Sequence, residues 1–172
     1  MNIARHLHTD LIKLRMETPG PSASDDSDAE DDEPSERQKR GQKRAVLDEL
    51  VGLLERSGRI GNRSKLLNEF ENRERKATTA IGHGIAIPHV RTLQAKELII
   101  AVALAPQGYD FDAPDGEPVK IFFVMAAPSY DDNLYLRVFK ALAEVLRFDY
   151  FRERLLSAEQ EYDIIRAFQE ME

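Results

Sequence analysis

Residues 82–89 read Gly-His-Gly-Ile-Ala-Ile-Pro-His, an apolar stretch that ends abruptly in Pro-His. Its glycines and small residues favour an extended backbone that other groups can approach closely. Pro88 fixes its own φ and biases Ile87 toward extended geometry, so we expect a stiff, buried strand over 84–88 that delivers His89 at its end. Histidine is the side chain best suited to act as a neutral nucleophile near pH 7. The stretch therefore indicates a phosphoryl acceptor, with glycines that leave room for an anion.

Two other interpretations of this histidine stay open on the residues alone. A Pro-His at the end of a strand is commonly a surface histidine without a chemical role. His83 and His89 also lie six residues apart, which would put both on one face of a continuous strand, as a zinc pair requires. Pro88 interrupts that strand, the chain has no Cys, and no carboxylate lies within the stretch, so we predict no metal site.

The composition bounds the class of protein. The 172 residues are enough for one domain with a substantial core, and 42% of them are hydrophobic, as in ordinary globular proteins. No apolar run approaches the ~20 residues needed to span a bilayer, and the first residues lack a secretory apolar region. The absence of Cys excludes a disulfide scaffold and thiol catalysis. We therefore expect a soluble cytoplasmic protein without membrane insertion.

The formal net charge of −7 comes mostly from one segment. Eight carboxylates lie between Asp25 and Glu36, directly after a run rich in Pro, Gly and Ser, and the rest of the chain is close to neutral. Such a composition cannot bury apolar surface, so we predict a disordered acidic insertion at about 18–36. Arg and Lys residues follow at 37–44, either as a solvated helix start or as a surface that the acidic run screens.

Hydrophobic periodicity predicts helices over about 36–57, 63–75 and 131–147, a short helical piece through 151–156, and a last helix opened by 157–160. Asn62 is the expected N-cap of the second helix. Continuous apolar runs at 98–104 and 119–125 suit strands covered on both faces, with a hairpin or excursion at the sheet edge between them and a short edge strand within 10–17. The pattern is typical of a single α/β domain over 1–172, with helices on both faces of a mixed sheet.

Residues around the opening stretch and further along the chain fall into a known pattern: Arg73-Glu74, Thr79, Gly82, 84–89, 111–119 and 142–156. This set resembles the phosphorylation-site signature and the following segments of fructose/mannitol-type enzyme IIA domains of the bacterial phosphoenolpyruvate-dependent phosphotransferase system. The opening residues 2–12 most resemble the nitrogen-regulatory branch, a stand-alone IIA protein. The resemblance covers nearly the whole chain except about 18–36.

The resemblance implies a mixed sheet of about five strands and a phosphoryl transfer from a histidine of the small carrier HPr, or its nitrogen-branch relative, to His89. Backbone N–H groups near 82–84 would hold phosphoryl oxygens, Arg73 would compensate charge, and Thr79 would donate a hydroxyl hydrogen bond. On the residues alone, Arg73 could instead form a helix-surface ion pair, and Thr79 could be a plain strand residue. No metal or other cofactor is implied. The residues expected to support the phosphate site are Arg73, Thr79, Gly82, His83, Gly84 and Tyr135.

The chain departs from the family at one expected site position. Many members carry a second histidine early in the helix after the third long strand, where this chain has Tyr135, or Asn133 if the register slips. Tyrosine can donate a hydrogen bond to a phosphate but carries no positive charge near pH 7. His83 could supply the missing imidazole or could be an exposed rim histidine, and Arg91 could add positive potential.

The expected function is that of a phosphohistidine phosphocarrier rather than a free-standing metabolic enzyme. We expect mainly a phosphorylation-dependent regulator whose partners are an HPr-type carrier and an unidentified target protein, with no direct nucleic-acid binding. A sugar-uptake phosphocarrier that serves a separate IIB domain and an unphosphorylated interaction module are the alternatives.

Overall fold

The two continuous apolar runs form the two central strands of the sheet. The computed structural model describes residues 1–20, 35–131 and 133–171. Its strands β5 (Ile99–Tyr109) and β6 (Val119–Pro128) pair antiparallel, with Val102 opposite Phe123. The connection expected at the sheet edge therefore joins two central strands, and its turn closes with Gly116 N–H donating to the Ala113 carbonyl at 3.0 Å.

The remaining strands flank this pair in the order β1-β5-β6-β3-β2, and β4 also pairs with β6. Beside β5 lies the two-residue β1 (Ile12–Lys13), which confirms the short edge strand. On the other side, β2 (Ala80–Gly82) pairs with β3 (Ile85–Ala86), and β3 and β4 (His89–Thr92) both run parallel to β6. The sheet is therefore mixed, with about five strands if β3 and β4 count as one interrupted strand.

His89 lies after the interruption between β3 and β4, which differs from its expected position. The prediction placed His89 at the end of a strand over 84–88, whereas in the structure it is the first residue of β4. Pro88 has no N–H for the ladder, but its carbonyl accepts a hydrogen bond from Met125 N–H at 2.9 Å. The alignment with β6 therefore continues through the proline, and His89 lies on an edge strand held on both sides of the break.

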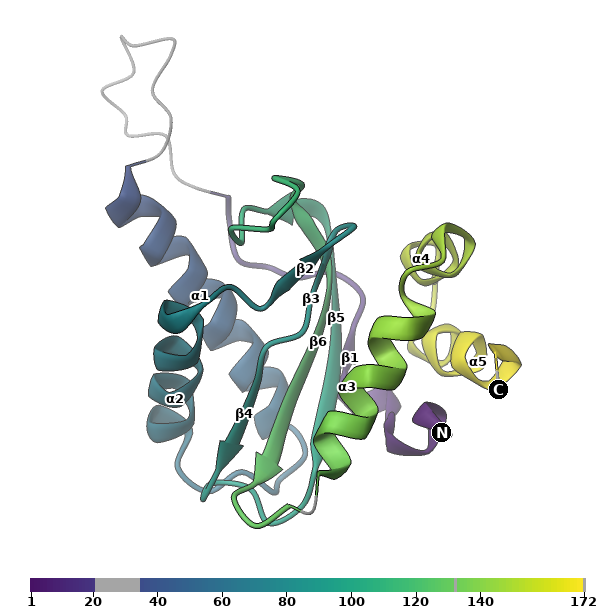
Figure 1. Cartoon of the computed structure of the whole chain (residues 1–172), viewed down its shortest axis with the longest axis horizontal. Helices are drawn as coiled ribbons and strands as arrows, with labels where there is room; N and C mark the ends of the chain where they lie inside the picture. The colour runs from purple at the N-terminus through teal and green to yellow at the C-terminus, as the bar shows by residue number, and fades with distance from the viewer. Residues whose placement is uncertain (21–34, 132, 172) are drawn as a thin grey trace, which may run out of the picture.

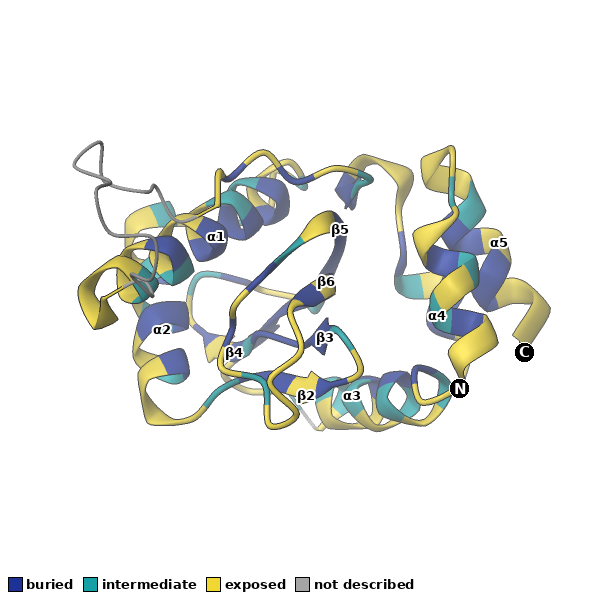
Figure 2. Cartoon of the chain, turned by 90° about the horizontal axis from the view of Figure 1, so that it is seen from above, coloured by how far each residue is buried: buried dark blue, intermediate teal, exposed yellow. Residues whose placement is uncertain are grey.

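Helices cover both faces of the sheet, as predicted (Figure 1). One face carries α1 (Glu36–Glu55) and α2 (Arg63–Lys76), and the other carries α3 (Leu134–Val145), α4 (Asp149–Leu156) and α5 (Glu161–Met171). Seen from above, each layer turns its buried side toward the sheet (Figure 2). Two short 3-10 helices, η1 (Ile3–His6) and η2 (Thr9–Leu11), precede β1. Because strand side chains alternate, the sheet separates two apolar cores, one on each face.

The alternation along β5 also sets how close the helices lie. In the middle of β5, Ala101, Ala103 and Ala105 lie in the core under α1 and α2, with Ile99 and Tyr109 at the ends of the strand. Ile100, Val102 and Leu104 lie in the core under α3, α4 and α5. Small side chains let a helix approach a strand closely, whereas branched ones need more room. At the middle of β5, α1 and α2 therefore pack on small side chains, whereas α3, α4 and α5 pack on larger ones.

Capping residues fix where the first two helices begin. The Asn62 side chain accepts a hydrogen bond from Lys65 N–H, which confirms the predicted N-cap of α2. Ser35 and Gln38 form a reciprocal capping box at the start of α1.

The segment before the predicted insertion is held by Thr18, whose N–H and hydroxyl donate to the Glu49 carboxylate at 2.8 and 2.6 Å. Both ends of the predicted insertion at 18–36 are thus part of the fold, and residues 21–34 lie outside the described ranges.

Candidate functional site

His89 is held in one tautomer by its own strand. Its Nδ1 lies 2.7 Å from the Ile87 carbonyl oxygen, two residues back along the chain. A carbonyl can only accept, so Nδ1 carries the hydrogen and donates it. Nε2 is then left without a proton and keeps its lone pair. The imidazole is half-buried and therefore presents one nucleophilic nitrogen in a fixed direction.

Two aromatic residues of α3 cover the imidazole. The Phe139 ring centroid lies 5.1 Å from that of His89, and the Tyr135 centroid lies 6.2 Å away. The two are four residues apart, so they occupy one face of the helix. Tyr135, the residue expected at the position of the family's second histidine, is therefore beside His89 in space. Phe139 was not predicted for the site, although its helical spacing from Tyr135 could have indicated it.

The surroundings of His89 lower its pKa below the ordinary value of 6.5. Burial is the largest cause, because it disfavours the charged imidazolium. The hydrogen bond to Ile87 raises the pKa in part, the positive charge of Arg73 lowers it, and the negative charge of Glu74 raises it. The net effect keeps His89 neutral at pH 7, the state in which Nε2 can attack.

Arg73 lies in the last turn of α2 and is fixed by a neutral acceptor. Its guanidinium donates to the carbonyl of Ala77, the C-cap residue, at 2.8 Å. Among the described residues, no carboxylate lies within ion-pair distance of Arg73, so the surface ion pair weighed as an alternative is not what holds it. The arginine is close enough to act on the pKa of His89, and its charge is uncompensated by any described acid.

A second arginine lies on the α3 side of the site. Arg91 follows His89 by two residues in β4, so both side chains leave the same face of the strand. Its guanidinium stacks over the Tyr135 ring, 5.0 Å from the centroid, and donates to the Asp131 carbonyl at 2.9 Å. The Asn133 side chain lies against Arg91, at 3.5 Å. Arg91 is thus linked to His89 through the Tyr135 ring.

Thr79 is engaged away from the free nitrogen of His89. Its hydroxyl donates to Glu74 Oε2 at 2.7 Å, and its carbonyl accepts the Ile87 N–H at 3.0 Å. The hydroxyl has only one hydrogen to donate, and the side chain is buried. The structure therefore gives Thr79 a place in the support of the strand, in contrast to the expected direct hydrogen bond to phosphate.

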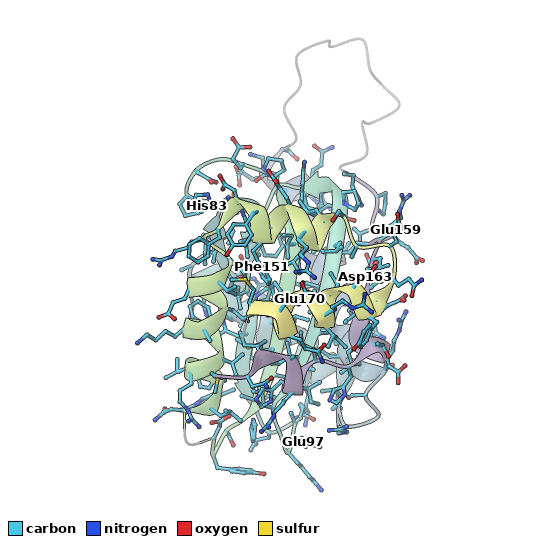
Figure 3. The ribbon with its side chains drawn as sticks, turned by 90° about the vertical axis from the view of Figure 1, so that its right-hand side faces the viewer. His83, Glu97, Phe151, Glu159, Asp163 and Glu170 are labelled. Carbon is cyan, nitrogen blue, oxygen red and sulfur yellow. The ribbon has the colours of Figure 1, made fainter. Side chains whose placement is uncertain are left out.

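The turn at 82–84 lies at the other end of β3 from His89. Gly82, His83 and Gly84 all have positive φ, at 93°, 57° and 76°, and the His83 N–H donates to Asp115 Oδ2 at 2.9 Å. An extended chain advances about 3.3 Å per residue, so Gly84 is on the order of 16 Å from His89. In Figure 3, His83 lies near one end of the molecule and Glu97 near the other.

These positions correct the expectation for the glycine turn. The expected phosphate contacts from Gly82 and Gly84, and the second imidazole from His83, do not come together with His89 in this fold. The glycines instead permit the positive φ values of the β2–β3 turn. The same separation removes the zinc pair considered for the two histidines, and the part of the chain with assigned structure contains no cluster of three or more His, Cys, Asp or Glu that could hold a metal ion.

The chain is thus an α/β protein in which an edge strand presents a neutral histidine beside a helix and two arginines, and neither arginine has an acidic partner among the described residues. The family model described as "Phosphoenolpyruvate-dependent sugar phosphotransferase system, EIIA 2" matches residues 35–171. The chain belongs to this family.

Relatives that are similar in sequence include fructose-specific components and nitrogen regulatory proteins. The chain is 35% identical to the PTS system fructose-specific EIIABC component of Bacillus subtilis over 124 residues, which are 72% of this chain but only 20% of that protein. It is 34% identical to the fructose-specific EIIA component of Haloferax volcanii, covering 71% of this chain and 79% of that one. The nitrogen regulatory protein of Pseudomonas aeruginosa is 33% identical, with 69% and 77% covered.

A solved structure supports the fold over nearly the whole chain. The nitrogen regulatory protein IIA-Ntr from Neisseria meningitidis superposes with a TM-score of 0.77 at 25% identity, covering 96% of this chain and 98% of that one. None of the helices in the described ranges combines the length and apolar character needed to cross a membrane.

Proposed function

We propose that this protein accepts a phosphoryl group on His89 Nε2 from the phosphohistidine of an HPr-type carrier, and that it acts mainly as a phosphorylation-dependent regulator in the cytoplasm. The observation that carries the proposal is the hydrogen bond from Nδ1–H to the Ile87 carbonyl, which leaves Nε2 as the free nucleophile. The lowered pKa of His89 keeps that nitrogen unprotonated at neutral pH.

The transfer needs alignment and charge compensation rather than proton abstraction. The Nε2 lone pair forms a bond to phosphorus while the bond from phosphorus to the carrier's nitrogen breaks, and that nitrogen keeps the electron pair. With its other ring nitrogen protonated, the carrier's imidazole leaves as a neutral ring, and the ring of His89, which keeps its Nδ1–H, takes up the positive charge. Negative charge on the phosphoryl oxygens would be compensated by Arg73 from α2 and by Arg91 from β4, because neither is paired with a described carboxylate.

The regulatory part of the proposal rests on likeness. The opening segment resembles the nitrogen-regulatory branch, and relatives named as nitrogen regulatory proteins match in sequence and structure. The matches to fructose-specific components favour a second candidate, a sugar-uptake phosphocarrier that hands phosphate to a separate IIB domain. The tyrosine at position 135 leaves a third candidate, an interaction module that is never phosphorylated.

One reconstituted reaction distinguishes the three. The protein is incubated with phosphoenolpyruvate, enzyme I and an HPr-type carrier, and its intact mass is followed. We expect the gain of one phosphoryl group, acid-labile and alkali-stable, attached at Nε2 by ¹⁵N NMR. His89→Ala should abolish the gain and His83→Ala should not. No gain with the wild-type protein would support the interaction module. Rapid loss of the phosphoryl group on adding a fructose-type IIB domain would support the sugar-uptake carrier.

A further inference from the structure

Glu74 is a buried carboxylate of α2 that accepts hydrogen bonds from Thr79, directly before β2, and from Lys43 of α1. Its side chain is only 5% exposed. Oε1 accepts the Thr79 N–H at 3.0 Å and the Lys43 ammonium at 3.2 Å, and Oε2 accepts the Thr79 hydroxyl at 2.7 Å. A buried charge is tolerated only when it is paired and hydrogen-bonded. The end of α2, the residue before β2 and the middle of α1 are thus fixed to one another.

The same hydrogen bonds continue without a gap to His89. The Thr79 carbonyl accepts the Ile87 N–H at 3.0 Å, and the Ile87 carbonyl accepts the His89 Nδ1–H at 2.7 Å. Between Ile87 and His89 stands Pro88, which fixes its own φ and adds no competing donor. The direction of the Ile87 carbonyl therefore depends on where Thr79 holds the backbone.

Lys43 is the residue of this hydrogen-bond series that lies furthest from His89 along the chain of contacts. Its ammonium also pairs with Asp112 at 2.8 Å and lies 4.8 Å from the centre of the Phe111 ring. Both belong to the connection between β5 and β6, so one lysine of α1 joins that connection to Glu74. The Lys43 side chain is largely buried, at 15% exposure. It is an anchor rather than a surface charge.

Resting on the proposed role of His89, we propose that Glu74 is a positioning residue, anchored by Lys43 and acting through Thr79 and the Ile87 backbone to hold the Nδ1–H tautomer of His89. The carbonyl of Ile87 decides which ring nitrogen carries the hydrogen, and therefore which one is free to accept phosphate. If the carbonyl turns away, Nδ1–H loses its acceptor and the imidazole can place its hydrogen on Nε2, where it blocks the attack. Glu74 touches neither the phosphoryl group nor the imidazole, so its effect is on alignment.

The decisive variant is Thr79→Val, which keeps the shape of the side chain and removes its hydroxyl. We expect ¹⁵N NMR to show a new population of His89 with the hydrogen on Nε2, and the phosphorylation rate to fall about tenfold or more, since loss of alignment carries penalties of that size. Thr79→Ser restores the hydroxyl and should restore both. Thr92→Val is the matched control, because Thr92 lies in β4 and is equally buried, at 3% against 4%. Among the described residues, its hydroxyl accepts only from Gln94 N–H.

A second variant, Glu74→Gln, retains the shape but removes the negative charge. Besides Glu74, whose charge acts on His89 without contact, the groups around the imidazole are Arg73 of α2, Tyr135 and Phe139 of α3, and Arg91, which stacks on Tyr135. With only the charge of Glu74 lost, the pKa of His89 should fall further below 6.5, as an NMR titration measures. The pH–rate profile of phosphorylation of the Glu74→Gln protein should move to lower pH, while its rate at high pH drops.

Two results would overturn the inference. One is a Thr79→Val protein with the wild-type tautomer population, and the other is a phosphorylation rate that matches Thr92→Val. The tautomer measurement needs no carrier protein, so it stays informative if the proposed phosphorylation fails. A shifted tautomer in a protein that is never phosphorylated would leave the positioning role standing and refute the proposed function alone.

Discussion

Replacing Arg73 with alanine should slow phosphoryl transfer to His89 without unfolding the protein. The guanidinium lies at the end of α2, fixed to the Ala77 carbonyl and without a described carboxylate partner, so its charge is available to an incoming phosphoryl group. A charge-assisted hydrogen bond contributes about 1.5–3 kcal/mol. At about 1.36 kcal/mol per tenfold in rate, Arg73→Ala should cost about 10- to 150-fold. The assay is single-turnover transfer from a phosphorylated HPr-type carrier, followed by intact mass.

The pH dependence gives this prediction a second, independent readout. Arg73 lowers the pKa of His89, so its removal should raise that pKa and leave less neutral imidazole at about pH 6. The deficit of Arg73→Ala relative to wild type should therefore widen as the pH falls from about 8 to about 6. Arg75→Ala is the control, since Arg75 lies in the same last turn but is 70% exposed and pairs with Glu71. Equal rates for the two variants at about pH 8 would refute the charge-compensation argument.

Three further perturbations test other parts of the site. Phe139→Ala should raise the pKa of His89 toward 6.5, because it admits water where burial is the largest cause of the lowered value, and an unchanged NMR titration would count against α3 as the cover. Tyr135→His should leave transfer intact or improve it, and a marked loss of single-turnover rate would contradict that expectation. Deletion of 21–34 should leave thermal melting nearly unchanged and alter salt-sensitive binding to a partner, whereas a drop of many degrees would show that the segment supports the fold.

The sheet and helices could be predicted because their signals are local. The runs at 98–104 and 119–125 contain almost no polar residue and have the length of a strand covered on both faces, and both form central strands. The last part of β5 was missed because Pro106 and Gln107 are exposed and break the apolar pattern. Pairing partners are set by contacts between distant residues, so the hairpin was recognised but its place in the sheet was not.

The expected neighbours of His89 came from two sources, the family register and nearness in sequence, and the structure treats the two differently. Tyr135 was placed through the family register and does lie beside His89. Gly82 and Gly84 were grouped with His89 because they are near in sequence, but an extended chain carries residues apart quickly. The hydrogen bonds of Glu74 depend on how α1 and α2 lie against β2, which no residue pattern encodes locally.

Burial of His89 under α3 links nucleophilicity, stability and charge. Because the folded-state pKa of His89 lies below its ordinary value of 6.5, the unfolded chain binds the proton more readily. The contribution of His89 to stability is therefore complete above about pH 6.5 and is lost as the pH falls through the folded-state pKa, the same direction in which the neutral nucleophile disappears. A phosphoryl group would bring negative charge into this half-buried site. Arg73 and Arg91 rest on the neutral carbonyls of Ala77 and Asp131 rather than on described carboxylates, so turning them toward phosphate breaks no described ion pair.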